Sequence, residues 1–500
     1  MAFPTIYPTG TTIYKPEKCF NGFTVFPANG LGIVLIDMNG AEVNVWANVH
    51  GFPVKMLKGG YIMGYRDMRP TEVARAEYTD LVQIDWDGNI VWKFDTYEKI
   101  KDGDEEERWM ARVKSDFQRE GNPVGYYSPS LEAKTDSGNT IMLVHSNVKK
   151  RKISRGTVLL DDTIIEVDWN GNIIWEWHFS DHFDELGFSE DAKNVLARNP
   201  NICGMAGSEP LADWLHVNNM AVVGPNKWYD AGDERFHPDN IIWDSREANI
   251  IGITSKKTGK IVWKMGPDYS TPELKKIGWI IGQHHAHIIP KGLPGEGNLL
   301  VFDNGGAAGY GGGVPGAESG HDIVKRDYSR VLEIDPTTFE IVWQYTPAEA
   351  GYINPVTAFG FYSPFISSAQ RLPNGNTLIC EGCGGRFIEV TAEHETVWEY
   401  IAPYYGGGLI RAGENADKPC NTVYRAYRVP YDYCPQAEKP NEIPIEPIDV
   451  TNFRVPGAAP KGTGRVVHVE GTKDFNDVIK NDNFCIATDE QQEKIKTILD

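Results

Sequence analysis

Residues 283–290, QHHAHIIP, place three histidines within four positions. Imidazole can act as a general base, a nucleophile or a metal ligand, so this segment is the first candidate for chemistry. The apolar residues that follow predict a strand, and alternation along a strand puts His285 and His287 on one face and His284 on the other. A metal site made by these three side chains alone is therefore not expected. A metal bound by histidines from separate parts of the chain stays open, as does a structural strand rich in histidine.

The charge of the chain limits its partners. Among 500 residues, 49 are basic and 69 acidic, which gives a net charge of −20. Nucleic acids and anionic membranes select broad basic surfaces, so neither is expected as a partner. The start of the sequence lacks a signal-peptide pattern, no apolar run reaches the length of a membrane span, and the seven cysteines are scattered. We expect a cytoplasmic protein that acts on a small molecule, and we leave open a homodimer.

One pattern recurs six times: an apolar strand, a polar turn and a second strand that ends in tryptophan. The copies cover residues 36–46, 83–92, 166–175, 254–263, 333–343 and 389–398. Turns with Asp, Asn or Gly between β-branched flanks are typical of β-hairpins. Six hairpins at intervals of tens of residues indicate radial repetition, so we predict an all-β fold, a six-bladed β-propeller.

Two unmatched pieces predict how the ring closes. Residues 421–430 have the pattern of an inner strand with no blade after it, and residues 22–46 have the pattern of three strands that lack an inner one. We expect the C-terminal strand to complete the sixth blade with the three N-terminal strands, because closure removes exposed sheet edges. The propeller would span residues 1–430, and residues 431–500 would form a C-terminal extension packed on it.

In a propeller the first strand of each blade lines the central channel. The predicted inner strands begin at polar residues, namely His50, Ser128 and Ser130, His216, His284 and His285, Ser367 and Ser368, and Thr422, Tyr424 and Arg425. Polar groups that converge in a buried channel are costly unless they bind something, so the channel is the predicted site. Each histidine taken alone has a structural alternative, and His145, on a second strand, is predicted to be structural.

Eight motifs follow one another in the second half of the chain. They are DWLHVN (213–218), QHHA (283–286), FDNG (302–305), YSRVLEID (328–335), VWQY (342–345), FYSP (361–364), LPNGNTLI (372–379) and YRA (424–426). In kind and order they resemble the arylsulfotransferase family of six-bladed propellers. The resemblance implies transfer of a sulfuryl group from one phenol to another through a transiently sulfated histidine. It also implies channel positions for His216, His284 and Thr422.

The chain departs from this family pattern at two places. The nucleophilic histidine should follow NTLI, but residues 380–390 read CEGCGGRFIEV, with Arg386 near the expected place. The sulfate-binding arginine should follow FDNG, where the glycine-rich segment 305–321 begins instead, and the nearest arginines are Arg326 and Arg330. We therefore expect a divergent member. The glycine-rich segment would be a lid over the site or a solvated loop.

Sulfuryl transfer between phenolic compounds is the leading hypothesis for the function. In it, His284 or His285 is the nucleophile or base, the other channel histidines stabilise charge, and Arg425 or Arg330 holds the anion. The predicted catalytic residues are His50, His216, His284, His285, Tyr424 and Arg425. The predicted substrate-binding residues are Asn218, Asn304, Arg330, Ser368, Arg386 and Thr422.

Two other functions stay open. The family also resembles polysaccharide lyases that use channel histidines for β-elimination next to a uronate. Such a reaction needs a base, an acid and a cation, which His216, His285, Tyr424 and Arg425 would supply. The other alternative is a propeller that binds a ligand without chemistry, because fold alone does not imply catalysis. None of these hypotheses requires a cofactor, although a metal held by channel histidines stays open.

Overall fold

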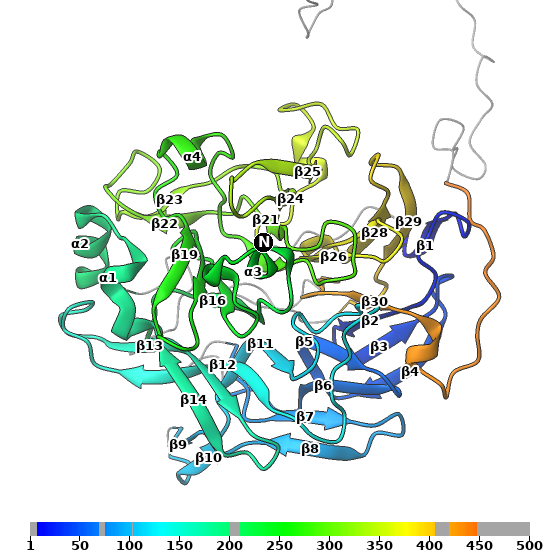
Figure 1. Cartoon of the computed structure of the whole chain (residues 1–500), viewed down its shortest axis with the longest axis horizontal. Helices are drawn as coiled ribbons and strands as arrows, with labels where there is room; N and C mark the ends of the chain where they lie inside the picture. Colours follow the sequence, from blue (N-terminus) through cyan, green and yellow to red (C-terminus); the bar gives the residue numbers. More distant parts are fainter. Residues whose placement is uncertain (1–7, 70–75, 103, 201–210, 406–419, 448–500) are drawn as a thin grey trace, which may run out of the picture. The chain divides into compact units, whose positions relative to one another are not determined.

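The structure is a computed structural model that describes residues 8–69, 76–102, 104–200, 211–405 and 420–447. In these residues the main strands form six antiparallel sheets around a common centre (Figure 1). Each sheet is a meander of four strands, and two sheets carry a fifth strand. The fold is the predicted six-bladed β-propeller.

We number the blades by their order along the chain. Blade 1 contains β5 (His50–Leu57), β6 (Tyr61–Tyr65), β7 (Leu81–Ile84) and β8 (Ile90–Phe94). Blade 2 contains β11 (Val113–Arg119), β12 (Thr140–Val148), β13 (Val158–Val167) and β14 (Ile173–His178). Blade 3 contains β16 (Val217–Val222), β17 (Ile241–Ser245), β18 (Ile250–Thr254) and β19 (Ile261–Met265).

Blades 4 to 6 complete the ring. Blade 4 contains β20 (His284–Ile288), β21 (Leu299–Asp303), β24 (Arg330–Ile334) and β25 (Ile341–Tyr345). Blade 5 contains β26 (Ser368–Arg371), β27 (Thr377–Glu381), β28 (Arg386–Val390) and β29 (Thr396–Ile401). Blade 6 contains β30 (Tyr427–Val429), β2 (Phe23–Ala28), β3 (Gly32–Ile36) and β4 (Glu42–Ala47).

Smaller elements decorate the blades. The added fifth strands are β15 (Leu211–Asp213), parallel to β13, and β1 (Gly10–Tyr14), antiparallel to β29. Two hairpins lie in the connections, β9 (Glu98–Ile100) with β10 (Arg108–Met110) and β22 (Ala308–Tyr310) with β23 (His321–Val324). The α-helices are α1 (Phe183–Leu186), α2 (Glu190–Arg198), α3 (Lys227–Asp230) and α4 (Pro272–Lys275). The 3-10 turns are η1 (Phe179–His182), η2 (Glu234–Phe236), η3 (Ala358–Gly360), η4 (Gly382–Gly384) and η5 (Tyr431–Tyr433).

The repeated tryptophans link each blade to the next. In all six blades a tryptophan on the outer strand donates its indole N–H to a backbone carbonyl in the outer hairpin turn of the following blade. The pairs are Trp46 to Asp85, Trp92 to Trp169, Trp177 to Gly259, Trp263 to Pro336, Trp343 to Ala392 and Trp398 to Met38, at 2.7–3.0 Å. The last pair joins blade 5 to blade 6, so the series closes on itself. In blade 2 the linking residue is Trp177 and not Trp175, the tryptophan that ends the sequence repeat.

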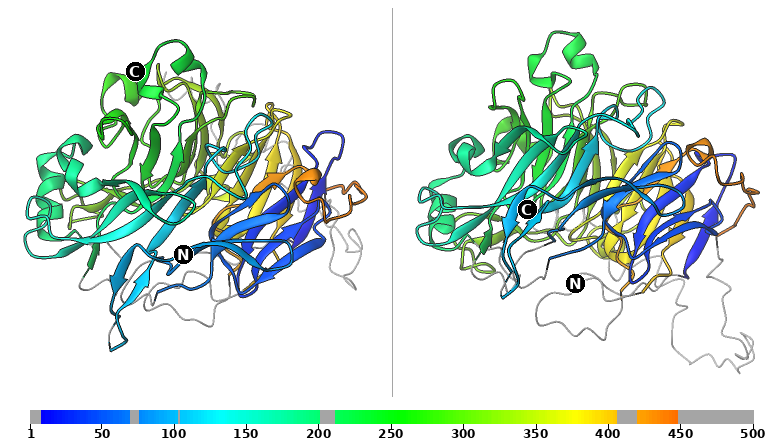
Figure 2. Two further views of the ribbon diagram at one scale, coloured as in Figure 1. Left: turned by 60° about the horizontal axis from the view of Figure 1, so that its bottom comes forward. Right: turned by 90° about the horizontal axis from the view of Figure 1, so that it is seen from below.

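The ring closes as predicted. Strand β30 pairs with β2 through Val25 and Tyr427 and their neighbours. Arg428, which is fully buried, donates to Thr24 Oγ1 at 2.7 Å and to Glu389 Oε2 at 3.1 Å, and so ties blade 6 to blade 5. Figure 2 shows the blue strands of blade 6 beside the yellow strands of blade 5, where the two ends of the propeller meet.

The prediction for the inner strand of blade 2 is wrong. That strand is β11, whereas Ser128 and Ser130 lie in the connection that follows it, where Ser130 donates to the Lys291 carbonyl at 2.8 Å. The residues of β11, VKSDFQR, are mostly polar, and yet all seven are buried. Ion pairs inside the ring explain this burial, and a single-strand hydrophobic pattern does not reveal them.

The chain divides into two compact units, residues 1–447 and 448–500, and the second lies outside the described residues. The predicted extension beyond residue 430 is therefore described only up to residue 447. In this part η5 follows the last inner strand, and Ile445 forms a backbone bridge with Tyr14 of β1. The helices of the described residues are all too short or too polar to cross a membrane.

Candidate functional site

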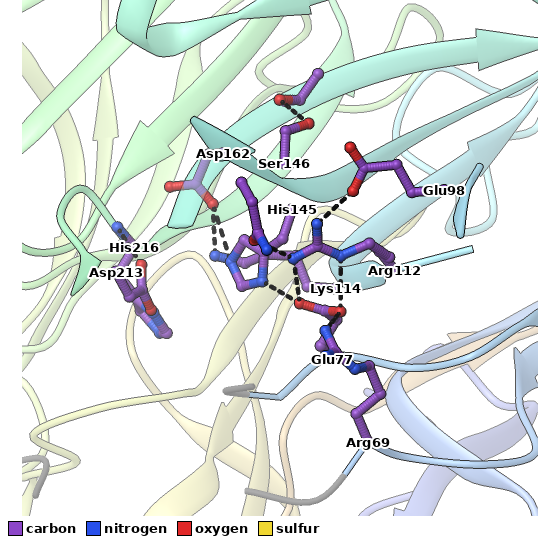
Figure 3. Close-up of polar contacts among 12 residues, drawn as sticks. Arg69, Glu77, Glu98, Arg112, Lys114, His145, Ser146, Asp162, Asp213 and His216 are labelled. Carbon is purple, nitrogen blue, oxygen red and sulfur yellow. Dashed lines mark hydrogen bonds and ion pairs between the residues drawn. The ribbon is translucent and has the colours of Figure 1, made fainter. Parts of the chain in front are cut away.

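The inner strands of the six blades all begin at the same end of the ring, because the blades repeat by rotation about one axis. At the start of β16, Asp213 and His216 form a close pair. The Nδ1 of His216 lies 2.6 Å from Asp213 Oδ2, and the backbone N–H of His216 donates to Asp213 Oδ1 at 3.2 Å. Figure 3 shows the two side chains packed against each other. The D-x-x-H spacing thus brings carboxylate and imidazole together through one tight turn.

The pair leaves one nitrogen of His216 for chemistry. Because Nδ1–H donates to a carboxylate, Nε2 carries the lone pair, and no residue in the described part of the chain hydrogen-bonds to it. Burial alone would raise the pKa of Asp213, but its interactions with His216 and with the ammonium group of Lys114 hold it well below its ordinary value. The carboxylate therefore stays ionised and orients the ring. The backbone of His216 has φ of +48°, a conformation that non-glycine residues adopt at a cost, often at functional sites.

Arg246 is a buried arginine that comes directly after β17. The backbone N–H of Arg246 donates to the His216 carbonyl at 3.3 Å, which places the two residues next to each other on blade 3. Its guanidinium is 8% exposed and pairs with Glu247, while Nε has no hydrogen-bond partner among the described residues. A guanidinium with an unused N–H is suited to hold an anion.

His284 has no free nitrogen in this structure. Its Nδ1 lies 2.7 Å from Asn304 Oδ1, and its Nε2 accepts from the backbone N–H of Ile366 at 3.1 Å. Asn304 is fixed in turn, because its amide N–H₂ donates to the carbonyls of Ser363 and Ile366, each at 2.7 Å. Burial and then the charge of Arg246 hold the pKa of His284 well below its ordinary value. Both nitrogens of this ring are engaged in hydrogen bonds, so it has no free lone pair for nucleophilic attack.

His285 and His287 lie in β20, whose pairing with β21 is irregular between His284 and His287, so simple alternation does not hold along this strand. The ring centres of His285 and His287 lie 4.5 Å apart. His287 Nε2 is 2.8 Å from the hydroxyl of Tyr126, and His285 Nε2 is 3.3 Å from the hydroxyl of Tyr427. Burial lowers the pKa of His287 to about 3 and that of His285 well below its ordinary value. Both rings are neutral and belong to a buried network.

A cluster of charges fills the inner strands beside these histidines. Asp116 lies 2.7 Å from Lys55 Nζ and 2.8 Å from Arg425 Nη1, and all three side chains are buried. Arg425 Nη2 also donates to the Asn218 carbonyl at 2.7 Å. The hydroxyl of Tyr424 donates to the same carbonyl at 3.0 Å, and its ring stacks on Phe52. Asp116 thus pairs with both cations, and we call Lys55, Asp116 and Arg425 the channel triad.

A family model described as arylsulfotransferase (ASST) matches residues 131–425, more than half of the chain. The chain belongs to the arylsulfotransferase family. The matched residues include the Asp213–His216 pair, Arg246 and His284, and the match ends at Arg425. No curated protein matches the chain.

Solved structures resemble this arylsulfotransferase-family chain only distantly. A Bacteroides caccae protein of unknown function has 12% identity and a TM-score of 0.40, covering 82% of this chain and 99% of that one. A putative 6-phosphogluconolactonase from Bacteroides fragilis has 10% identity and a TM-score of 0.35, with coverages of 83% and 100%. Apo AztD from Citrobacter koseri has 10% identity and a TM-score of 0.34, with coverages of 81% and 98%. TM-scores below 0.5 do not bear on the activity, so the family match is the finding that identifies the chain.

The other predicted site residues lie at various places in this arylsulfotransferase-family propeller. His50 begins β5 and is exposed, with its ring 5.9 Å from that of Tyr78. Thr422 is buried before β30, where its Oγ1 accepts from Asn29 at 3.3 Å. Ser368 is buried in β26 opposite Cys380.

Two predicted anion-binding arginines are engaged inside the blades. Arg330 donates through Nε and Nη2 to Asp303 Oδ2, at 2.8 and 2.7 Å. Arg386 pairs with Glu381 and Glu399 at 3.2 and 2.7 Å. These ion pairs stabilise blades 4 and 5, and neither arginine lies beside His216 in the sheet order.

The glycine-rich segment packs over the Asp213–His216 turn. Gly306 allows a close approach of chains, since a Cβ there would lie 1.9 Å from the Pro364 carbonyl oxygen. Further along, β22 and β23 pair, and the Tyr310 hydroxyl donates to the Trp214 carbonyl at 2.8 Å. The first part of the segment is therefore an ordered cover and not a solvated loop.

Sequence reasoning passed over three residues of this site: Asp213, Arg246 and Lys114. Asp213 was visible in the DWLHVN motif, because a carboxylate three residues before a histidine can reach it across a turn. Arg246 and Lys114 carried no local signal, since their roles depend on the packing of neighbouring blades.

Proposed function

We propose that this member of the arylsulfotransferase family transfers a sulfuryl group from an aryl sulfate to a phenolic acceptor, with His216 as the nucleophile. The observation that carries the proposal is the Asp213–His216 pair, with Nδ1 fixed 2.6 Å from a buried carboxylate and Nε2 left for attack. The sequence motifs contain three histidines. His284 and His285 have neutral rings within buried networks, whereas His216 lies at the edge of a buried network.

The proposed transfer has two steps. In the first, the Nε2 lone pair of His216 attacks the sulfur, the sulfur–oxygen bond to the donor breaks, and the donor leaves as a phenolate. Asp213 balances the positive charge that develops on the imidazole ring, and Arg246 is suited to hold the sulfuryl oxygens. In the second, the acceptor phenol oxygen attacks the sulfur, the nitrogen–sulfur bond breaks, and the phenolic proton passes to water.

Intact mass spectrometry tests this proposal. The purified chain is incubated with p-nitrophenyl sulfate, and nitrophenol release is recorded with the protein mass. We expect a gain of one sulfuryl group that is lost when phenol is added. The gain should be absent in His216→Gln and present in the matched variant His284→Gln, with circular dichroism confirming that both variants fold.

The elimination hypothesis rests on the same pair. An imidazole oriented by a carboxylate also serves as a base for proton abstraction. Two results together would favour elimination over sulfuryl transfer. The wild-type chain would raise the ultraviolet absorbance of a uronate substrate, and it would form no sulfuryl adduct with p-nitrophenyl sulfate. Failure of both assays in a folded chain would favour the propeller that binds without chemistry.

The remaining expectations about the partners follow the proposed reaction. A small phenolic molecule would be the substrate, the net charge of −20 disfavours nucleic acid, and we propose a cytoplasmic location. Size-exclusion chromatography with light scattering tests the homodimer that the sequence leaves open.

A further inference from the structure

Three acid–base side chains from three strands of blade 2 converge behind His216. His145 on β12 and Asp162 on β13 are direct cross-strand partners, so their side chains share a face. Asp213 on β15 lies opposite Leu160 in the parallel pairing with β13, and Leu160 points to the same face as Asp162. One ligand-type atom from each of the three lies within 4.8 Å of the others (Figure 3).

His145 presents an unpaired nitrogen to a carboxylate. Its Nδ1 is 3.0 Å from Glu77 Oε2, so Nδ1 carries the hydrogen and donates it. Its Nε2 is fully buried, has no hydrogen-bond partner in the described residues, and lies 3.7 Å from Asp162 Oδ1. The lone pair of Nε2 therefore faces the carboxylate of Asp162 with no proton to bridge the two groups. This arrangement is unfavourable unless a cation lies between them.

The geometry of His145 is that of a metal-bound histidine. Metal-ligating histidines commonly donate the second ring N–H to a carboxylate, which fixes the tautomer and aims the other nitrogen at the ion. Glu77 has this position, and Arg112 and Arg69 hold Glu77 in turn, with Arg112 Nε 2.9 Å from Glu77 Oε1. The ring of His145 is thereby held in place with its Nε2 aimed toward Asp162.

Buried acidic side chains gather around this cluster. Four carboxylates with at most 8% exposure and three buried cations lie in it or next to it, and Asp213 also has His216 as a partner. The carboxylates are those of Glu77, Asp102, Asp162 and Asp213, and the cations are Arg69, Arg112 and Lys114. Glu98, partly exposed, adds a further negative charge through its pair with Arg112. Among these cations, Lys114 forms an ion pair with one of the three converging residues, with its Nζ 2.5 Å from Asp162 Oδ1.

We propose that His145 Nε2, Asp162 and Asp213 bind a divalent first-row transition-metal ion. One imidazole nitrogen and two carboxylates suit Zn²⁺ or Mn²⁺, whereas Ca²⁺ and Mg²⁺ prefer oxygen ligands alone. In the bound state the ligand atoms close around the ion and the ammonium of Lys114 moves off Asp162. Asp213 then joins the ion to the Nδ1 of His216. The proposal stands on the contacts of blade 2 and does not depend on the sulfuryl-transfer reaction.

Metal analysis of the full chain tests the site directly. The chain is dialysed against chelator, reloaded with Zn²⁺ or Mn²⁺, desalted and measured by inductively coupled plasma mass spectrometry. We expect about one ion per chain, with a higher thermal midpoint than that of the chelated protein. His145→Gln and Asp162→Asn should each lose the ion and the rise in midpoint. The matched control Asp161→Asn, on the same strand but outside the converging set, should keep both.

Replacement of the competing cation sharpens the test. If the ion and Lys114 share one place, Lys114→Met should bind Zn²⁺ more tightly, and added Zn²⁺ should restore its thermal midpoint. No retained ion in the wild-type chain, or a Lys114→Met variant that Zn²⁺ does not stabilise, would overturn the proposal and leave Lys114 as the sole counter-charge. Because metal content is read without substrate, its outcome is separate from that of the sulfuryl-transfer assay.

Discussion

Removal of the central carboxylate of the channel triad should destabilise the propeller strongly. Asp116 is 1% exposed, and its two oxygens lie 2.7 Å from Lys55 and 2.8 Å from Arg425. Asp116→Asn keeps the size of the side chain and one acceptor oxygen but removes the charge. Two cations that are 3% and 0% exposed then face each other across the inner strands with no ionised partner in contact.

The expected loss follows from the geometry. At about 2.7 Å and an effective dielectric constant of about 20, each pair is attracted by about 6 kcal/mol before desolvation is counted. Measured losses on removing one partner of a buried pair are about 3–5 kcal/mol. Asp244 is a second buried carboxyl near Arg425, and burial raises its pKa well above the ordinary value. Its ionisation in the variant would offset part of the loss, so we expect about 3 kcal/mol for Asp116→Asn and more when Asp244→Asn is added.

Urea unfolding followed by tryptophan fluorescence measures this loss as a shift of the midpoint at constant slope. Asp136→Asn, at an exposed turn, serves as the control and should change the midpoint little. A loss below about 1 kcal/mol for Asp116→Asn, with no further loss in the Asp116→Asn, Asp244→Asn double variant, would refute the view that the triad is held by its own charges.

Three further predictions concern catalysis, closure and acid. Asp213→Asn should lower kcat/KM for sulfuryl transfer by about 10²–10⁴-fold, because Nδ1–H of His216 loses its carboxylate partner; steady-state kinetics with p-nitrophenyl sulfate checks it. Trp398→Phe should cost about 1–3 kcal/mol in urea unfolding by orphaning the Met38 carbonyl, whereas Trp175→Phe, which breaks no link between blades, should cost less. Burial would raise the pKa of Asp116, but Lys55 and Arg425 hold this pKa below its usual 3.8. The ionised carboxylate therefore stabilises the fold above about pH 4, and this stabilisation is lost as the pH falls further. Acid unfolding of Asp116→Asn should show a smaller loss over that range.

Local sequence signals were sufficient for most of the fold. Each outer hairpin is set by its own turn, as at Asp85 and Asp168, whose side-chain oxygens accept from backbone N–H groups two and four residues on. Closure through β30 was also predictable. The C-terminal end of the propeller had an inner strand without a blade, and the N-terminal end had a blade without an inner strand. The wrong prediction for the inner strand of blade 2, which is β11, has a physical cause. Its Lys114 and Asp116 are buried only because Asp162, Lys55 and Arg425 neutralise them, and those partners come from other strands.

The roles of the histidines depend on such distant partners even more. Nothing near residue 284 in the sequence indicates that Ile366 and Asn304 occupy both nitrogens of His284, so the motifs alone favoured His284 over His216 as the nucleophile or base. His216 differs because its partner Asp213 is three residues away, and that pairing is encoded locally.

Polar groups in a buried channel need no ligand where they pair with one another. Lys55, Asp116 and Arg425 are such a case, because Asp116 pairs with both cations. Nε of Arg246 and Nε2 of His145, by contrast, are among the buried atoms of the described residues that have no hydrogen-bond partner. An unmet hydrogen-bonding requirement in a buried group is therefore a better guide to the site than polarity itself. The proposed anion-binding role of Arg246 and the proposed cation site at His145 both rest on such a group.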